Sequence, residues 1–329
     1  MPTHDLIVIG TSLGGVEALQ LVIATLAPDL PATICIVWHM SPESPGVLPA
    51  MLSKVSPLPV RFVQHNEPIT PGIIYVAPPD YHTLIVDHVF QLSYGPKENR
   101  FRPAIDPLFR SAAVAFGPRA VGVILSGALD DGIAGLAAIK AQGGMTIVQD
   151  PQEAFEPSMP HHAINQVAID YIKPAAAIGS LLTSLARTQT APPSDYQPRW
   201  DLVTETQIAQ ANVDHKYDIS QLGELSPYTC PECHGVLFQI MQDGILRFRC
   251  HTGHAYSVRT LLDEISKAVE ASLWSTIRAM DEKVFLLQHI AQHMDEQASL
   301  TMAEQLRNHA RAVEQQSQLV RLALLRKLA

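Results

Sequence analysis

The chain has 329 residues, of which 47% are hydrophobic, and a formal net charge of −9. This length allows two or more domains with a sizeable core. The acidic balance argues against general binding of nucleic acid or anionic membranes, because both need a basic surface. The N-terminus lacks the features of a signal peptide, and no apolar run of about 18 residues occurs. We therefore expect a cytoplasmic protein without membrane insertion.

A short apolar segment predicts a first buried strand over residues 6–10, followed by a glycine-rich turn and a helix over 14–26. Ser12 stands in this turn between Gly10 and Gly14, which fits the G-x-S-x-G pattern of serine hydrolases. A serine placed there, beside the free N–H groups of a helix start, can serve as a nucleophile. Dinucleotide and Walker A loops are alternatives, but the first needs a glycine where Ser12 stands and the second needs a lysine.

Residues 1–187 alternate between strand and helix patterns. Beyond the first pair, strands are predicted at 34–39, 60–63, 73–77, 121–126 and 146–149, a hairpin at 83–93, and helices at 104–116 and 131–142. Apolar strands that alternate with helices predict an α/β fold. We expect a doubly wound, mostly parallel sheet with helices on both faces.

Two polar residues follow other strands of this predicted sheet. His39 comes at the carboxyl end of the second strand, on the same sheet edge as Ser12, and is a candidate base; an ordinary capping or surface histidine is the alternative. An aspartate of the pair Asp130 and Asp131 follows the strand at 121–126. It is either a helix N-cap or the carboxylate that orients the imidazole.

Backbone N–H groups in the same two turns are candidates for stabilising an oxyanion. They are those of Leu13, next to Ser12, and Ala128, in the turn after strand 121–126.

Residues 188–225 change character, and their proline-rich part, 190–198, predicts an extended linker. Of the four cysteines, Cys35 lies in an apolar strand and is expected to fill core space. Such cysteine usage favours a reducing compartment.

Residues 226–256 form a Cys/His segment with a predicted hairpin around Asp243-Gly244. A C-x-x-C pair followed by Cys-His-Thr-Gly-His predicts a structural zinc site, a ribbon or knuckle, because thiolates and imidazole suit zinc. The expected ligands are Cys230, Cys233, Cys250 and His254, with His251 or His234 as alternatives for the fourth place. Three unpaired reduced cysteines are the other interpretation.

The final segment, 257–329, is helical in pattern. One apolar stripe recurs every three or four positions, at Leu261, Ile265, Val269, Leu273, Ile277, Met280, Val284 and Leu287. A capping box at Thr301–Glu304 predicts the start of a second helix. We expect a helical hairpin or coiled-coil-like region, which either packs on itself or forms a homodimer.

Five segments in order carry a family resemblance: residues 9–15, 37–40, 75–82, 102–109 and 125–132. Together they resemble the catalytic domain of the chemotaxis receptor methylesterases, the CheB family, over about residues 4–186. The resemblance implies that Ser12 is the nucleophile, His39 the base and Asp131, not Asp130, the carboxylate. The order Ser…His…Asp disfavours an α/β-hydrolase.

The resemblance implies hydrolysis of glutamate methyl esters on chemoreceptors or similar helical signalling proteins, and allows deamidation of glutamine, without a cofactor for catalysis. The family usually has Thr at Leu13 and Met at Ala128, which bears on substrate fit and rate. Strand one starts near residue 5, so we expect no receiver domain in this chain. The C-terminal Cys/His segment resembles extensions of some family members. Alternatives are a serine hydrolase of another acyl substrate and a catalytically silent signalling or assembly module.

Overall fold

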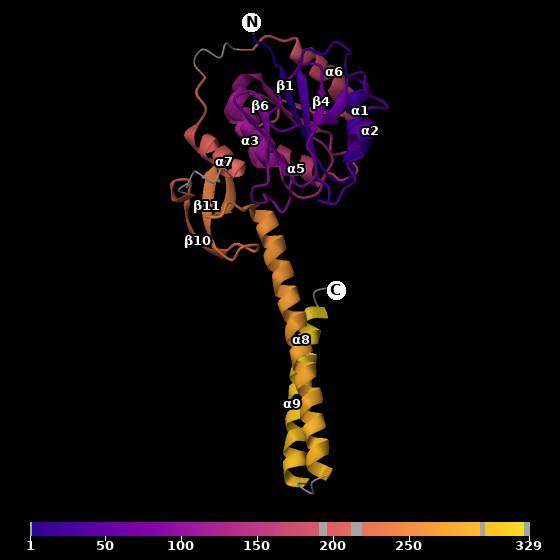
Figure 1. Ribbon diagram of the computed structural model, residues 1–329, viewed down its shortest axis with the longest axis vertical. Helices are drawn as coiled ribbons and strands as arrows, with labels where there is room; N and C mark the ends of the chain where they lie inside the picture. The colour runs from indigo at the N-terminus through magenta and orange to yellow at the C-terminus, as the bar shows by residue number, and fades with distance from the viewer. Residues whose placement is uncertain (1, 191–195, 212–218, 297–299, 326–329) are drawn as a thin grey trace. The chain divides into compact units, whose positions relative to one another are not determined.

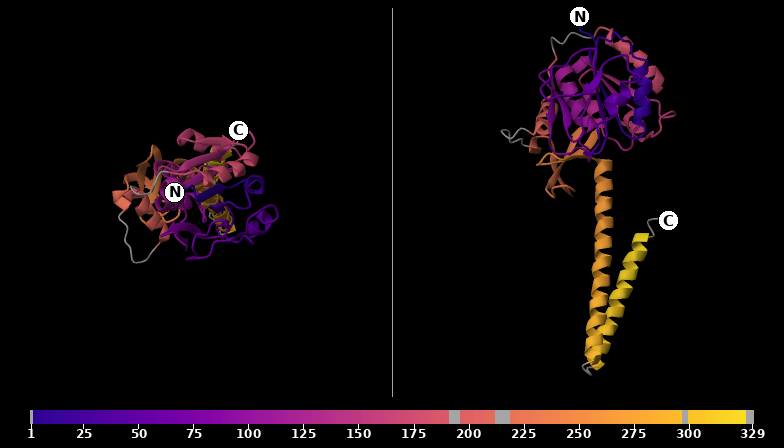
Figure 2. Two further views of the ribbon diagram at one scale, coloured as in Figure 1. Left: turned by 90° about the horizontal axis from the view of Figure 1, so that it is seen from above. Right: turned by 45° about the vertical axis from the view of Figure 1, so that its right-hand side comes forward.

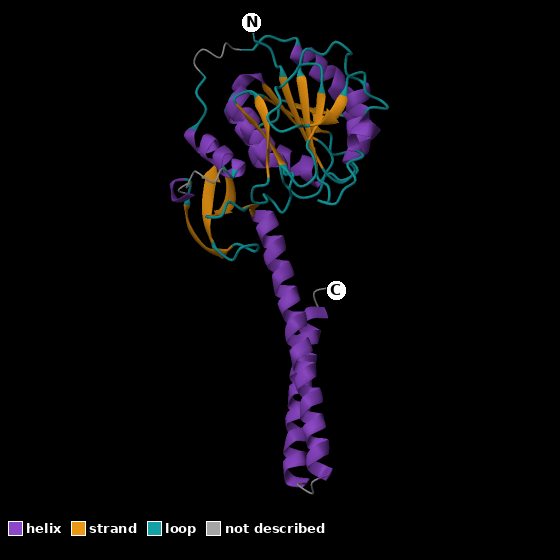
Figure 3. Cartoon of the chain, viewed as in Figure 1, coloured by secondary structure: helices purple, strands orange, loops and turns teal. Residues whose placement is uncertain are grey.

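A computed structural model describes residues 2–190, 196–211, 219–296 and 300–325. The chain divides into two compact units, Met1–Leu261 and Leu262–Ala329. Figure 1 shows the elements, Figure 2 two further views, and Figure 3 the same chain by secondary structure. Each unit is described by itself.

A seven-stranded sheet organises the first unit. Its order is β3-β4-β2-β1-β7-β8-β9, and every neighbouring pair is parallel. The strands are β1 (Leu6–Thr11), β2 (Thr33–Trp38), β3 (Val60–Phe62), β4 (Ile74–Val76), β7 (Ala120–Ile124), β8 (Met145–Gln149) and β9 (Tyr171–Lys173). Strands β2, β4 and β3 lie on one side of β1 and strands β7, β8 and β9 on the other. This change of direction at β1 creates a crevice at the carboxyl ends of β1, β2 and β7. The predicted doubly wound α/β fold is confirmed.

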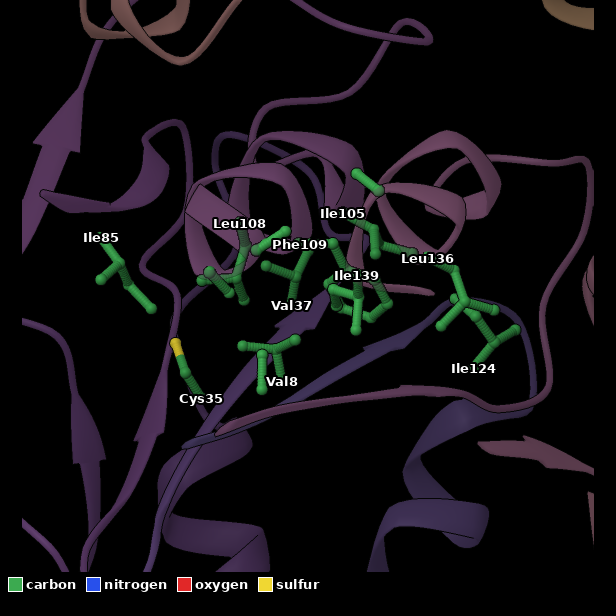
Figure 4. Packing of buried hydrophobic residues seen from close by; sticks show 14 of the residues in the cluster. Val8, Cys35, Val37, Ile85, Ile105, Leu108, Phe109, Ile124, Leu136 and Ile139 are labelled. Atoms are coloured by element: carbon green, nitrogen blue, oxygen red, sulfur yellow. The ribbon is translucent and has the colours of Figure 1, made fainter. Parts of the chain in front are cut away.

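Both faces of the sheet are covered (Figures 1 and 3). Leu6 and Val8 of β1 belong to one core cluster and Ile7 and Ile9 to the other, as the alternation of side chains along a strand requires. The first cluster packs on α3 (Ile105–Phe116), α4 (Ile133–Ala141) and α5 (Ser158–Gln166), the second on α1 (Gly15–Ala24), α2 (Leu48–Leu52) and α6 (Ala175–Ala186). Figure 4 shows the first cluster, which includes Cys35, as expected.

The predicted hairpin is present as β5 (His82–Val86) and β6 (Val89–Ser93). Within residues 1–187, four α-helices and strands were not predicted: α2, α5, α6 and β9. Helix α2 and strand β9 are short, and α5 and α6 carry prolines or alanine runs that give a weak periodic signal. Their positions are decided by packing against the sheet.

The segment expected to be an extended linker, 188–225, contains helix α7 (Trp200–Gln210). Leu202 of this helix is fully buried in the first core cluster, and the Tyr196 hydroxyl donates to the backbone carbonyl of Val114 at 3.1 Å. This part of the segment is therefore packed on α3 rather than extended. The expected extended stretch 190–198 lies partly, over 191–195, outside the described residues.

The Cys/His segment folds as a four-stranded antiparallel sheet, which we call the ribbon (residues 224–257). Its strands, in order, are β10 (Glu224–Thr229), β11 (Val236–Gln242), β12 (Ile245–Cys250) and β13 (Ala255–Ser257). The predicted turn at Asp243-Gly244 joins β11 and β12. Both residues have positive φ, 52° and 79°, as the tight hairpin turns that match strand twist require.

The second unit consists of the long helices α8 (Val258–Glu296), which begins just inside the first unit, and α9 (Leu300–Leu325). Val284 of α8 packs against Ala310 and Val313 of α9, and Ser317 donates to Asp281 at 3.0 Å, so the helices run antiparallel. The helical hairpin is as expected, although α9 starts one residue before Thr301. None of the described helices has the length and apolar character needed to cross a membrane.

Candidate active site

The turn after β1 presents Ser12. Gly14 adopts φ 73° and acts as the N-cap of α1, a conformation that favours glycine, so the chain reverses sharply at this point. The Ser12 amide donates to the Ser126 carbonyl at 3.0 Å, and the Ser126 hydroxyl donates to the Leu13 carbonyl at 2.7 Å. These bonds tie the turn after β1 to the turn after the neighbouring strand β7.

His39 follows β2 and contacts both other candidate residues. Its Nδ1 lies 3.2 Å from Ser12 Oγ, and its Nε2 lies 2.7 Å from Asp131 Oδ2. The His39 ring stacks on Phe101, with centroids 3.6 Å apart and planes within 6°. With Nε2–H donating to the carboxylate, Nδ1 is left as the acceptor that faces the serine hydroxyl. Structure and expectation agree that these three side chains meet at one edge of the sheet.

Asp131 lies between β7 and α4 and is 1% exposed. Its Oδ2 also accepts from the Ile105 amide at 2.6 Å, and its Oδ1 accepts from Asn99 Nδ2 at 2.9 Å. Burial alone raises the pKa of this carboxyl, but the bonds from His39, Ile105 and Asn99 outweigh burial and hold the pKa below its usual value. The carboxylate therefore stays ionised and keeps the imidazole oriented.

Asp130 has a different environment from Asp131. Its Oδ1 accepts from the Ser257 hydroxyl at 2.7 Å, and burial raises its pKa. Gly132, not an aspartate, is the N-cap of α4, so the helix-cap interpretation is wrong for both aspartates. The structure thus separates the two adjacent carboxyls by partner: Asp131 contacts His39, and Asp130 contacts the ribbon.

Two backbone amides are available near the serine. Within the described residues, the amides of Leu13 and Ala128 donate to no protein acceptor. A Cβ on Gly127 would stand 3.0 Å from Ser12 Cβ, so the turn that carries Ala128 passes directly beside the serine. Glycine at 127 permits this close approach. Unpaired N–H groups beside a serine hydroxyl are the type of donor that binds an oxyanion.

Three residues of the site were not singled out from the sequence. Asn99 contacts Asp131 and Phe101 contacts His39, and the Asp106 carboxyl group accepts from Asn99 Nδ2 at 2.9 Å and from the Gly135 amide at 2.7 Å. All three lie in or beside segment 102–109, which carries the family resemblance. Only Asp106 had a signal in the sequence, a carboxyl group in the first turn of a predicted helix.

The Asp106 carboxyl is buried close to Asp131. Burial, followed by the neighbouring negative charge of Asp131, raises the pKa of Asp106 to about 8. The folded protein therefore holds a proton on Asp106 near neutral pH, while the unfolded chain releases it near the ordinary value of about 4. Unfolding then releases a proton, so this group favours folding at low pH, and its contribution is lost as pH rises toward 8.

We expect Asp106→Asn to flatten the decline of melting temperature between pH 5 and pH 8, because an amide does not titrate. The measurement is the melting temperature of both proteins across that range. Asp29→Asn, at an exposed ion pair with Arg187, is the matched control and should keep the wild-type slope. Parallel slopes for wild type and Asp106→Asn would mean that Asp106 is already ionised at neutral pH.

An open cleft of about 390 Å³ leads to the serine. Its lining includes Ser12, His39 and Phe101 together with the cationic side chains Lys97 and Arg102. The Arg102 guanidinium is itself paired with Asp80 at 2.8 Å and lies over the Tyr94 ring. The rim is therefore structured and carries positive charge, in contrast to the acidic chain as a whole.

A second cluster of polar side chains lies in the ribbon. The ligand atoms of Cys230, Cys233, Cys250 and His254 all lie within 4.8 Å of one another. The Cys233 and Cys250 sulfurs are 3.6 Å apart, and His254 Nδ1 is 3.6 Å from Cys250 Sγ. Tetrahedral zinc with Zn–S bonds of about 2.3 Å places its sulfurs roughly 3.8 Å apart, so the four residues fit such an ion.

The surroundings of the cluster suit a cation. Burial, followed by the neighbouring sulfurs of Cys230 and Cys233, raises the pKa of the Cys250 thiol to about 12, a penalty that a bound cation removes. His254 Nε2 lies 3.4 Å from a Glu232 carboxylate oxygen, the kind of outer contact that orients a metal-binding imidazole. Of the three candidate histidines, His254 is the one grouped with the cysteines.

The part of the chain that forms the parallel sheet and its helices is similar to known proteins. The family model described as CheB methylesterase matches residues 7–182. The crystal structure of the Thermotoga maritima CheB methylesterase catalytic domain superimposes with a TM-score of 0.54 and 33% identity, and the match covers 55% of this chain and 98% of that one.

Two curated relatives show how far the similarity extends. A putative protein-glutamate methylesterase/protein-glutamine glutaminase of Leptospira interrogans is 38% identical over 183 residues, which is 55% of this chain and 95% of the relative. Protein-glutamate methylesterase/protein-glutamine glutaminase 2 of Anaeromyxobacter dehalogenans is also 38% identical, over 56% of this chain and 54% of the relative. The matched family model ends before α7 and the ribbon begin.

Proposed function

This chain belongs to the CheB methylesterase family, and we propose that it is a protein-glutamate methylesterase that acts on chemoreceptors without a cofactor for catalysis. The single observation that carries the proposal is the chain of contacts from Ser12 through His39 to Asp131, at 3.2 and 2.7 Å. Both distances fall within the reach that a nucleophile, its base and the orienting carboxylate need.

The proposed reaction follows from these positions. His39 Nδ1 takes the hydroxyl proton as Ser12 Oγ attacks the γ-carbonyl carbon of a glutamate methyl ester. The amides of Leu13 and Ala128 bind the resulting oxyanion, and Asp131 stabilises the imidazolium. His39 then returns the proton to the departing methanol. Water hydrolyses the acyl-enzyme with the same base, which restores Ser12 and leaves a glutamate carboxylate.

The exposed parts of the site support a protein substrate. Leu13 is 55% exposed beside the serine, and the cleft is open, so a side chain that projects from a helix can enter it. Lys97 on the rim adds positive charge that can pair with a carboxylate of a substrate helix. A glutamine side chain places its γ-carbonyl carbon at the same distance from the backbone as the methyl ester and has an amino group as the leaving group, so deamidation at the same site belongs to the proposal.

We also propose roles for the remainder of the chain. The catalytic domain covers 1–187, a connecting segment 188–225, a structural zinc segment 226–256, and a helical region 257–329 that serves docking or homodimerisation. Large apolar side chains such as Val269, Phe285 and Leu319 are exposed on the two long helices, which supports a partner there. A cytoplasmic location fits receptor signalling domains as substrates.

The experiment is methanol release from methylated receptor fragments, with ammonia release from the corresponding glutamine forms and hydrolysis of small acetyl esters measured alongside. We expect methanol release to have the highest kcat/KM of the three. Faster turnover of acetyl esters than of receptors would favour a hydrolase of another acyl substrate. Absence of all three activities in a protein that keeps its fold would favour a silent assembly module.

A further inference from the structure

One loop lies between the three proposed catalytic side chains and the ribbon. We call residues 97–102, which connect the end of the β6 region to α3, the bracket loop. It forms its own tight turn, in which the Phe101 amide donates to the Glu98 carbonyl at 2.9 Å. Asn99 has φ 50°, a left-handed conformation that asparagine adopts more readily than most residues. This turn directs successive side chains toward different partners.

On one side, the bracket loop contacts two members of the triad. Asn99 Nδ2 donates to Asp131 Oδ1 at 2.9 Å, and the same amide nitrogen donates to Asp106 Oδ2 at 2.9 Å. Phe101 covers the His39 ring. Both hydrogens of the Asn99 side-chain amide are thus donated to carboxyl groups, and one of these bonds holds Asp131 Oδ1, the oxygen that does not contact His39.

On the other side, the same loop pairs with strand β13 of the ribbon. The Ser257 backbone N–H donates to the side-chain oxygen Oδ1 of Asn99 at 2.8 Å. The backbone N–H of Asn99 donates to the Ala255 carbonyl at 2.8 Å, and the backbone N–H of Ala255 donates to the Lys97 carbonyl at 3.3 Å. Asn99 is 4% exposed, so water does not offer it alternative partners. Its side-chain oxygen is therefore held by the ribbon and its nitrogen by the catalytic carboxylate.

A buried charge network reinforces this contact. Glu98 of the bracket loop accepts from Arg110 of α3 at 2.7 Å and from Arg249 of β12 at 2.9 Å, and Arg249 and Arg247 both pair with Glu205 of α7. All five side chains are at most 6% exposed. Removing the ribbon would leave Glu98 with half of its positive partners, which is costly for a buried charge.

We propose that Asn99 is a positioning residue whose side-chain amide is held by the backbone N–H of Ser257. Through this amide, the folded ribbon sets the orientation of Asp131 and the catalytic rate of the serine site. The inference rests on the proposed function for its chemistry. The proposed link gives the ribbon a role in a site whose residue Asp131 lies more than 100 positions before Ser257 in the sequence. Misplacement of a catalytic group by about 1 Å costs on the order of 10²-fold in rate.

The first test changes Asn99 in the full chain. Asn99→Gly keeps the left-handed backbone and removes the side-chain amide. It should lower kcat about 10- to 100-fold because Asp131 loses its positioning, and it should leave KM within about 2-fold because the cleft that binds the substrate is unchanged. Asn99→Asp places a third carboxyl beside Asp106 and Asp131. The activity of this variant relative to wild type should rise as pH falls, since the introduced carboxyl can again donate a hydrogen bond once it is protonated. A purely structural role would not produce this trend.

The second test changes the ribbon side. Ser257→Ala loses only the hydroxyl, which donates to Asp130 at 2.7 Å and accepts from the Thr260 amide at 3.0 Å, whereas Ser257→Pro also loses the backbone N–H that donates to Asn99 Oδ1. Tyr256, the residue before it, lies in a strand and is extended, as the position before proline prefers. We expect Ser257→Ala to stay within about 3-fold of wild type and Ser257→Pro to lower kcat about 10-fold or more. In an Asn99→Gly background, Ser257→Pro should add little, because both changes break the same link.

Labelling of Ser12 by a fluorophosphonate separates this inference from the proposed function. If wild type labels rapidly but releases no methanol from receptors, the substrate is wrong; slower labelling of Asn99→Gly and Ser257→Pro would still support the positioning role. If wild type hydrolyses receptor esters and both variants match its kcat and labelling rate, the function stands and the positioning role is overturned. Melting curves confirm that each variant is folded under assay conditions.

Discussion

Asp131→Asn is expected to lower kcat for ester hydrolysis by about 10⁴-fold, the loss that the same substitution causes in a serine protease triad. Asp131 Oδ2 accepts from His39 Nε2 at 2.7 Å, and an amide nitrogen in that place would favour the tautomer with its proton on Nδ1. Nδ1 could then no longer accept the proton of Ser12. The measurement is steady-state kcat on a methylated receptor, with circular dichroism to verify the fold.

Asp130→Asn is the matched control for this prediction. It changes the adjacent residue in the same turn, and an asparagine oxygen can still accept from the Ser257 hydroxyl. We expect its kcat to stay within about 3-fold of wild type. Equal losses in the two variants would assign the effect to the turn as a whole and would contradict a specific role for the Asp131 carboxylate.

Cys230→Ser is expected to reduce bound zinc from about one ion per chain to near zero and to lower the melting temperature of the first unit. Cys230 is fully buried within the cluster of ligand atoms, and the small core of the ribbon includes Cys230 and Cys250 themselves. Structural zinc sites in small folds are worth roughly 10–16 kcal/mol of apparent binding free energy, so the ribbon depends on the ion for its stability. Elemental analysis and limited proteolysis measure the two effects.

Cys35→Ala provides the comparison, because it removes a buried thiol in the sheet, far in sequence from the ribbon. It should lower stability through a small core cavity while leaving the zinc content at the wild-type level. If purified wild-type protein carries no metal and Cys230→Ser melts and resists protease as wild type does, the zinc proposal is wrong.

The proposed catalytic side chains could be predicted because each follows a buried strand. Ser12, His39 and Asp131 stand after β1, β2 and β7, and the ends of adjacent parallel strands meet at one edge. Local chemistry supplied the rest: glycines in the turns, and Cys and His at metal-binding spacing. Each of these signals involves only a few neighbouring residues, so it can be recognised without a structure.

The support around the triad could not be predicted in this way. Glu205 lies in a segment whose composition predicts a polar linker, yet it is buried, because Arg247 and Arg249 from the ribbon neutralise it. Asn99 has no local pattern that distinguishes it from a turn residue. Its importance arises only when β13, more than 150 residues later, pairs with the bracket loop.

Local patterns in the chain were enough to predict the doubly wound α/β fold, the three side chains that meet at its edge, the Cys/His cluster and the two C-terminal helices. The reason is that hydrophobic period, turn chemistry and ligand spacing are local properties. Long-range contacts decided three other features: α7 packs on α3, Asp130 and Asp131 face different partners, and Asn99 links the ribbon to the Asp131 carboxylate. Those outcomes depend on which distant segments share a low-dielectric interior, where an unpaired buried polar group is costly.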